Sequence, residues 1–159
     1  ENGIIMLWRK EELLKVLIHE LIHSFKLDRK YVGEEETYTE YYALLLHINL
    51  ELMERDIYCK KMFNKLLKIE KEFSVEQSKK TIKCTNNGTN LYMYINEKSR
   101  LLHNIKKHKW DKFLDSYKIN KKKVSDKSLR FTITDLYLKK YPRKDFNGVK
   151  METYIIDKK

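Results

Sequence analysis

Glycine, proline and cysteine are scarce in this chain of 159 residues, which has four, one and two of them respectively. So few turn-forming residues leave little material for the tight turns of an all-β fold, and the sequence therefore predicts a mainly α protein. The cysteines, Cys59 and Cys84, form no CxxC pair. Their number and spacing exclude a disulfide-stapled miniprotein and a zinc ribbon, and they indicate a reducing, intracellular location.

Long apolar runs are also missing. The longest one near the start covers residues 4–8, far short of the roughly 20 residues that a membrane span requires, so we expect no membrane partner. The length fits a single domain over residues 1–159. Because the chain begins at Glu1 rather than at a methionine, we expect this domain to be the C-terminal part of a longer protein whose upstream part is a partner.

Positive charge is abundant, with 34 Lys+Arg against 23 Asp+Glu and a formal net charge of +11. Lysine supplies 28 of these basic residues and arginine only six, whereas nucleic-acid recognition usually relies on arginine. The lysines are spread along the chain among many Asn, Ile and Tyr residues, a bias that an AT-rich genome also produces. We interpret them mainly as a solvated surface, and a nucleic-acid partner is possible but not favoured.

Apolar periodicity predicts most of the secondary structure. It indicates helices over residues 9–26, 34–56, 57–73, 91–107, 110–117 and 128–141, and Ser74 with Gln77 resembles a capping box that opens a short helix through residue 84. In the first helix we expect an apolar face of Leu13, Leu14, Leu17, Leu21 and Phe25. The second helix is apolar on nearly every side at residues 41–46 and should be central. Residues 3–8 and 149–156 are candidate strands.

The first predicted helix contains the motif His19-Glu20-Leu21-Ile22-His23, an HExxH pattern. Residues four apart project from one face of a helix, so both imidazoles can bind a single Zn²⁺ ion as cofactor. Glu20 then lies beside a metal-activated water and can act as the general base and acid of hydrolysis. Composition alone would yield roughly 0.014 such motifs in this chain. The alternative is two half-buried histidines on an amphipathic helix without a metal.

A third metal ligand has to come from elsewhere. The extension HExxHxxGxxH is absent, because Lys26 and Arg29 occupy its glycine and last histidine positions. We expect Glu40 to be the ligand, since an inward-facing carboxylate at the point where the second helix becomes apolar needs a cationic partner. Glu36 lies one turn earlier on the same face, where it can orient a ligand histidine or be the ligand itself.

The HExxH motif together with Thr39-Glu40-Tyr41-Tyr42-Ala43 resembles the gluzincin branch of zinc metallopeptidases, over about residues 9–50. In that family a glutamate from a later helix, in a phrase like N-E-x-x-A, joins the HExxH histidines. The resemblance implies a zincin-like helical domain, peptide-bond hydrolysis of a peptide or protein substrate, His19, His23 and Glu40 as ligands, and Glu20 as catalytic residue. Thr39 replaces the usual asparagine. The Lys, Asn, Ile and Tyr bias also resembles zincin-type proteins encoded by large DNA viruses, so that a host cell or a virion becomes the expected location.

The same resemblance implies a downstream group that stabilises the oxyanion, and an upstream edge strand, here residues 3–8, that binds substrate backbone. The candidates for the downstream group lie in the helix predicted over residues 91–107: Tyr92, Tyr94, Arg100 and His103. His47 lies seven residues beyond Glu40, on nearly the same helical face, and can support the metal site or be a satisfied core histidine. Core packing is the alternative for both tyrosines.

Two other classes of function compete with a zinc metallopeptidase. One is a catalytically silent zincin fold that serves as a structural or interaction module, such as a virion component. The other is a lysine-rich helical domain that binds nucleic acid. Retention of Glu20 argues against the first, because a structural zinc gains nothing from a carboxylate beside an open coordination position. The second predicts binding that depends steeply on salt and not on chelators.

Overall fold

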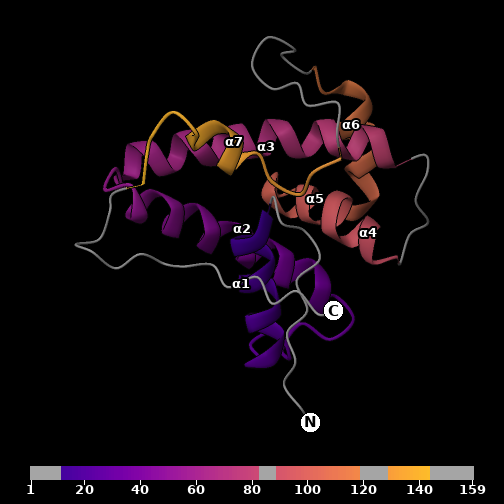
Figure 1. The fold of residues 1–159 in the computed structure, drawn as a ribbon. Helices are drawn as coiled ribbons and strands as arrows, with labels where there is room; N and C mark the ends of the chain where they lie inside the picture. The colour runs from indigo at the N-terminus through magenta and orange to yellow at the C-terminus, as the bar shows by residue number, and fades with distance from the viewer. Residues whose placement is uncertain (1–11, 83–88, 119–128, 144–159) are drawn as a thin grey trace, which may run out of the picture.

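Helix α2 (Glu35–Glu54) is the centre of the structure, a computed structural model that describes residues 12–82, 89–118 and 129–143 (Figure 1). It packs against α1 (Leu13–Ser24), α3 (Lys60–Thr81), η2 (Met93–Glu97), α5 (Lys98–Leu102) and α7 (Thr134–Leu138). The remaining elements are α4 (Asn90–Tyr92), the 3-10 turn η3 (Lys107–Lys109) and α6 (Trp110–Ser116). The described residues contain no strand, and the prediction of a mainly α fold is confirmed.

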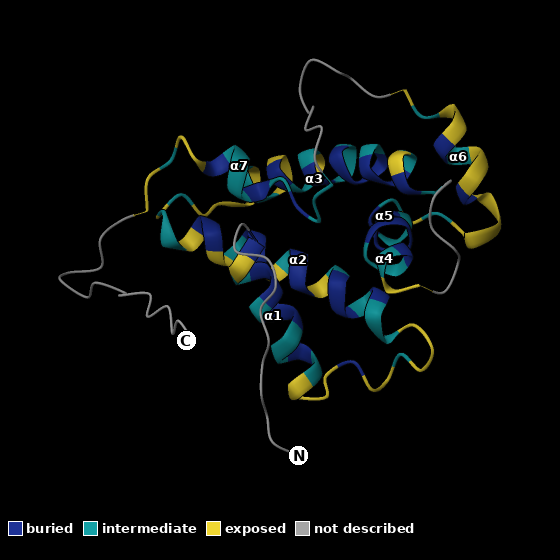
Figure 2. Cartoon of the chain, turned by 45° about the vertical axis from the view of Figure 1, so that its right-hand side comes forward, coloured by how far each residue is buried: buried dark blue, intermediate teal, exposed yellow. Residues whose placement is uncertain are grey.

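Two apolar clusters hold α2 in place from opposite sides. On one side Ala43 packs against Ile18 and Ile22 of α1. On the other, a larger buried cluster joins α2 to α3, α5 and α7; its members are Leu44, Ile48, Leu52, Leu66, Leu102 and Leu138. A third cluster fixes α6 on α3 through Val75, Trp110 and Leu114. Figure 2 shows α2 between α1 and α3, with buried residues along all three helices.

The central position of α2 agrees with its apolar sequence, although one stripe along it is exposed: Tyr42, Leu46, Leu50 and Met53. The apolar face predicted for the first helix is wrong. The structure buries Val16, Ile18 and Ile22 there, whereas Leu13 and Phe25 are 40% and 70% exposed. Apolar residues surround most of α1, so periodicity could not select a face. Packing on Ala43 selects the one that carries His19.

The predicted break in the third helix is also wrong, because α3 runs without interruption from Lys60 to Thr81. Ser74 does not cap a new helix. Its hydroxyl donates to the Lys71 carbonyl and lies 2.8 Å from the hydroxyl oxygen of Ser99 on α5, so a buried polar contact uses it instead.

The later helices are shorter than predicted. The segment expected over residues 91–107 begins where Thr89 caps it, with Thr89 Oγ1 accepting a hydrogen bond from the Tyr92 amide, and its helical turns end at Leu102. The segment expected over residues 128–141 is helical only from Thr134 to Leu138. The candidate strands at residues 3–8 and 149–156 lie outside the described residues. No helix in the described ranges combines the length and the apolar character needed to cross a bilayer.

Candidate metal centre

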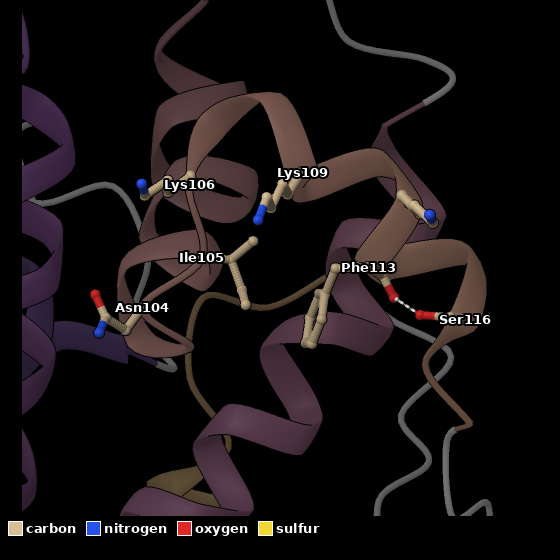
Figure 3. Close-up of a pocket in the computed structure, with 7 residues that line it drawn as sticks. Asn104, Ile105, Lys106, Lys109, Phe113 and Ser116 are labelled. Atoms are coloured by element: carbon tan, nitrogen blue, oxygen red, sulfur yellow. Dashed lines mark hydrogen bonds between the residues drawn. The ribbon is translucent and has the colours of Figure 1, made fainter.

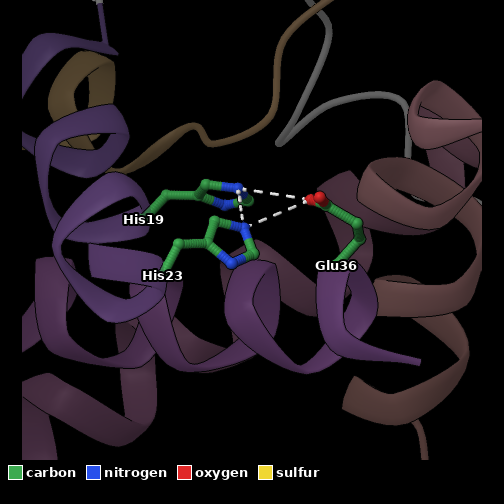
Figure 4. Close-up of side chains that lie close together, drawn as sticks. All are labelled: His19, His23 and Glu36. Atoms are coloured by element: carbon green, nitrogen blue, oxygen red, sulfur yellow. Dashed lines mark hydrogen bonds and ion pairs between the residues drawn. The ribbon is translucent and has the colours of Figure 1, made fainter. Parts of the chain in front are cut away.

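Helix α1 carries both histidines of the HExxH motif on the face that it turns toward the first turn of α2 (Figure 4). His19 is buried and His23 is half-buried. The four-residue spacing places their rings in edge-to-face contact, with centroids 4.8 Å apart. Both Nε2 atoms point toward one carboxylate, that of Glu36.

The three ligand-type atoms form a nearly equilateral triangle. His19 Nε2 and His23 Nε2 are 3.1 Å apart, and Glu36 Oε2 lies 3.4 Å from the first and 3.5 Å from the second. Four ligands at about 2.0–2.1 Å from a zinc ion in a tetrahedron have neighbouring ligand atoms about 3.3–3.4 Å apart. The triangle therefore has the size of one face of a tetrahedral zinc site.

Glu36 supplies an unusual oxygen to this triangle. Its Oε2 is buried and has no hydrogen-bond partner among the described residues. A buried carboxylate oxygen left without a donor is costly, and a cation at the centre of the triangle would satisfy it. The donor set of two imidazole nitrogens and one carboxylate oxygen suits Zn²⁺.

Glu40, which we expected to be the third ligand, does not join the triangle, and Glu36 takes that place in the geometry. Its Oε2 lies 3.1 Å from Nδ1 of His19, the ring nitrogen that faces away from Glu36. Its Oε1 accepts hydrogen bonds from the ammonium group of Lys15 and, at 3.2 Å, from that of Lys98. Two buried lysines thus meet the charge requirement that had suggested a metal at Glu40.

The lysines decide the charge state of Glu40. Burial alone would raise the pKa of the Glu40 carboxyl, but the charges of Lys15 and Lys98 and the hydrogen bond with His19 hold it well below its usual value. The carboxylate therefore accepts the Nδ1–H of His19. That hydrogen bond leaves the lone pair of neutral His19 on Nε2, the atom that faces the triangle.

Asp28 does the same for the second histidine. Its Oδ2 lies 2.5 Å from Nδ1 of His23, and it comes from the turn that follows α1. Sequence reasoning missed Asp28, since an aspartate five residues after the motif in a turn has no distinctive spacing. Each ring is consequently held by a carboxylate on Nδ1, the arrangement in which protein histidines commonly bind metals.

Even without a metal, the site favours a bound proton on His19, beside the Nε2 atom of His23. Burial lowers the pKa of His19, but its contacts with the carboxylates of Glu36 and Glu40 outweigh that effect and raise the pKa to about 9. The close approach of His19 likewise lowers the pKa of Glu36. A proton and a metal ion would thus compete for the same position.

Tyr94 is the downstream candidate that the structure brings to this site. Its ring meets that of His19 edge-on, with centroids 5.3 Å apart, and its hydroxyl lies near the Glu36 carboxylate. Burial and the Glu36 charge raise the pKa of this hydroxyl, so Tyr94 stays protonated as a donor. Tyr94 belongs to η2, a π-helical segment of the kind that is frequent at functional sites.

Glu20 follows His19 on α1, about 100° further round the helix. Its side chain is half-buried, and no described residue hydrogen-bonds or pairs with its carboxylate. It is thus an uncommitted acidic group next to the first histidine of the triangle.

The other predicted residues lie elsewhere. Tyr92 is buried and does not contact the histidines. Arg100 is engaged by Glu97 at 2.7 Å and by the Ile105 carbonyl at 3.1 Å. His103 lies 3.1 Å from the Lys71 carbonyl, and His47 contacts Asp135 of α7.

A separate groove of about 730 Å³ lies beside α6 (Figure 3). Its lining includes Lys106, Lys109, Lys112 and Phe113. Three lysines and one aromatic ring on one hollow are the features that the nucleic-acid interpretation would require.

Comparison of the chain with protein-family models, with curated proteins and with solved structures finds no match in any of the three. The function of the chain therefore has to be inferred from the geometry of the site.

Proposed function

We propose that this protein is a zinc-dependent peptidase in which His19, His23 and Glu36 bind the metal. The observation that supports this most is the triangle of His19 Nε2, His23 Nε2 and Glu36 Oε2, with sides of 3.1–3.5 Å. Three protein ligands leave the fourth tetrahedral position free, which is the arrangement of catalytic rather than structural zinc sites. Zn²⁺ bound there would supply Lewis acidity, polarising a water molecule and the substrate carbonyl.

Residues of the chain would orient the metal ligands, transfer the proton and stabilise the oxyanion. Glu40 and Asp28 hold the two histidines with Nε2 toward the site. Glu20, with no partner of its own in the described part of the chain, takes a proton from the attacking water and returns it to the leaving amine. Tyr94 can donate its hydroxyl to the oxyanion that forms on the substrate carbonyl.

The decisive experiment combines metal analysis with one substitution. The variant His19→Ala/His23→Ala should lose one zinc equivalent relative to the purified chain, and hydrolysis of a fluorogenic peptide library should stop on chelation. Glu20→Gln should keep the zinc and lower turnover at least about 100-fold, since a general base contributes roughly 10²–10⁴-fold. Glu72→Gln, at a half-buried glutamate of α3, is the matched control and should leave both unchanged.

Each other result has a defined meaning. A chain that binds no zinc at His19 and His23 overturns the proposal. Zinc binding in a chain without hydrolysis would instead assign the site to a structural or interaction module. Full activity of Glu20→Gln would remove Glu20 from the mechanism.

A second candidate function rests on the lysine-lined groove beside α6. If that groove binds a nucleic acid, affinity for an oligonucleotide should fall steeply with salt and persist in the presence of a chelator. The variant Lys109→Ala should weaken that binding and leave the zinc content unchanged. Weak binding at physiological salt in the unsubstituted chain would discard this candidate.

A further inference from the structure

A second group of metal-ligand side chains lies at the opposite end of α2. His47 and Glu51 are four residues apart and share a face of that helix, and Asp135 reaches them from α7. One ligand atom from each of the three residues lies within 4.8 Å of the other two. His47 is eleven residues beyond Glu36, about 16 Å along the helix, so this group is separate from the first site.

The imidazole of His47 has no satisfied polar atom. The residue is fully buried, and neither Nδ1 nor Nε2 has a hydrogen-bond partner in the described structure. Nε2 lies 3.3 Å from Oδ1 of Asp135, close enough for an ion pair but without the alignment of a hydrogen bond. Leaving a buried polar atom unsatisfied is unfavourable, which indicates that Nε2 has a partner of another kind.

Glu51 is also fully buried, and two arginines hydrogen-bond to its carboxylate. Its Oε2 is bonded to Arg55, and its Oε1 accepts a hydrogen bond of 2.7 Å from Arg143. A carboxylate offers about four lone-pair positions, and these two guanidinium contacts use only one on each oxygen. The arginines fix the carboxylate and still leave lone pairs for a cation.

The balance of charge at this place favours a cation. Three carboxylates, those of Glu51, Glu54 and Asp135, face two guanidinium groups, since Arg143 also pairs with Glu54 at 3.0 Å. One negative charge is therefore left over when His47 is neutral. The excess lies on the half-buried carboxylates of Glu54 and Asp135 beside the fully buried Glu51, and a cation between His47, Glu51 and Asp135 would compensate it.

We propose that His47, Glu51 and Asp135 form a second divalent-cation site. One nitrogen and two carboxylate oxygens are a donor set that suits Zn²⁺. The ion would join α7 to α2 beside Leu138, a member of the large apolar cluster. Its role is to hold the short α7 on the core, independently of hydrolysis at the first site.

The test uses zinc titration against a chromophoric chelator, together with thermal unfolding. The double variant His19→Ala/His23→Ala removes the first site and should still bind one equivalent of zinc, with a rise in Tm on zinc addition. Adding Asp135→Asn should abolish both the binding and the rise in Tm. Asp115→Asn, at an exposed aspartate of α6, is the matched control and should change neither.

Asp135→Asn is nearly isosteric at a side chain that is 32% exposed, so it should fold, and His47→Asn tests the same site from α2. The proposal is overturned if the double variant binds no zinc, or if Asp135→Asn and His47→Asn leave its zinc equivalent in place. Loss of stability with unchanged zinc stoichiometry would mean that His47 and Asp135 form only an ion pair. Failure of the first site would be seen differently, as zinc binding that His19→Ala/His23→Ala does not reduce.

Discussion

Nδ1 of His19 lies 3.1 Å from Oε2 of Glu40, on the opposite edge of the ring from the Nε2 atom that faces Glu36. Two glutamates one helical turn apart thus contact the two nitrogens of one imidazole. One contact orients the ring, and the other completes a metal-sized triangle.

Glu36→Gln should mainly affect zinc binding, whereas Glu40→Gln should mainly affect the stability of the fold. The first removes a charged ligand and should abolish most zinc binding while changing the stability of the metal-free fold little. The second leaves Lys15 and Lys98 buried without their counter-charge, which should lower the free energy of unfolding by about 3–5 kcal/mol. Chelator competition and urea unfolding of the metal-free variants measure the two quantities. Greater loss of zinc in folded Glu40→Gln would return the ligand role to Glu40.

Asp28→Asn should weaken zinc binding without abolishing it. The carboxylate holds Nδ1 of His23 at 2.5 Å, and loss of such an orienting partner costs about 10–100-fold in metal affinity. Asp115→Asn removes an equal charge at an exposed position and serves as the control. Equal zinc affinities of the two variants would show that Asp28 has no part in the site.

The pH dependence follows from His19. Its pKa is about 9 in the metal-free fold and about 6.5 in an unfolded chain, so the folded state binds the proton more tightly. The stability that this proton contributes is complete below pH 6.5 and is lost as the pH rises to about 9. Thermal unfolding of the metal-free protein between pH 6.5 and 9 should show that decline, and a His19→Gln variant should not.

Zinc must displace the same proton. Near pH 7.5 binding should therefore release about one proton from His19, and zinc affinity should rise with pH up to about 9. Calorimetry in two buffers of different ionisation enthalpy counts the proton. A heat of binding that is identical in both buffers would contradict the competition between proton and metal.

Glu70 of α3 should be important for the position of α7. Its Oε1 accepts hydrogen bonds from the backbone amides of Ile133 and Thr134, at 2.9 and 2.8 Å, and from the hydroxyls of Thr132 and Thr134. Glu70→Ala would leave these buried donors unsatisfied and should lower the free energy of unfolding by at least about 3 kcal/mol. In Glu72→Ala, at a half-buried neighbour on α3, the loss should be below about 1 kcal/mol in the same chemical denaturation experiment.

The fold was predictable where local signals dominate. The spacing of apolar residues and the scarcity of glycine and proline predicted the helices, and α2 was located to within two residues at each end. The errors arose where a residue type is compatible with two structural roles. Ser74 has the residue type of a cap but lies within α3 and hydrogen-bonds to Ser99 of α5. The apolar sides of α1 left the choice of its buried face to packing on Ala43.

His19 and His23 share one face of a helix because 3.6 residues per turn brings positions four apart together, so this feature could be predicted from the sequence. Which carboxylate faces their Nε2 atoms depends instead on how the helices pack. Glu36 and Glu40 lie on the same face of α2, so helical spacing does not distinguish them as ligands. The way α1 crosses α2 brings Glu36 to the Nε2 atoms, and Lys15 of α1 and Lys98 of α5 form ion pairs with Glu40 instead. Asp28 and Tyr94 reach the histidines through a turn and through the packing of η2 on α2, contacts that helical periodicity does not encode.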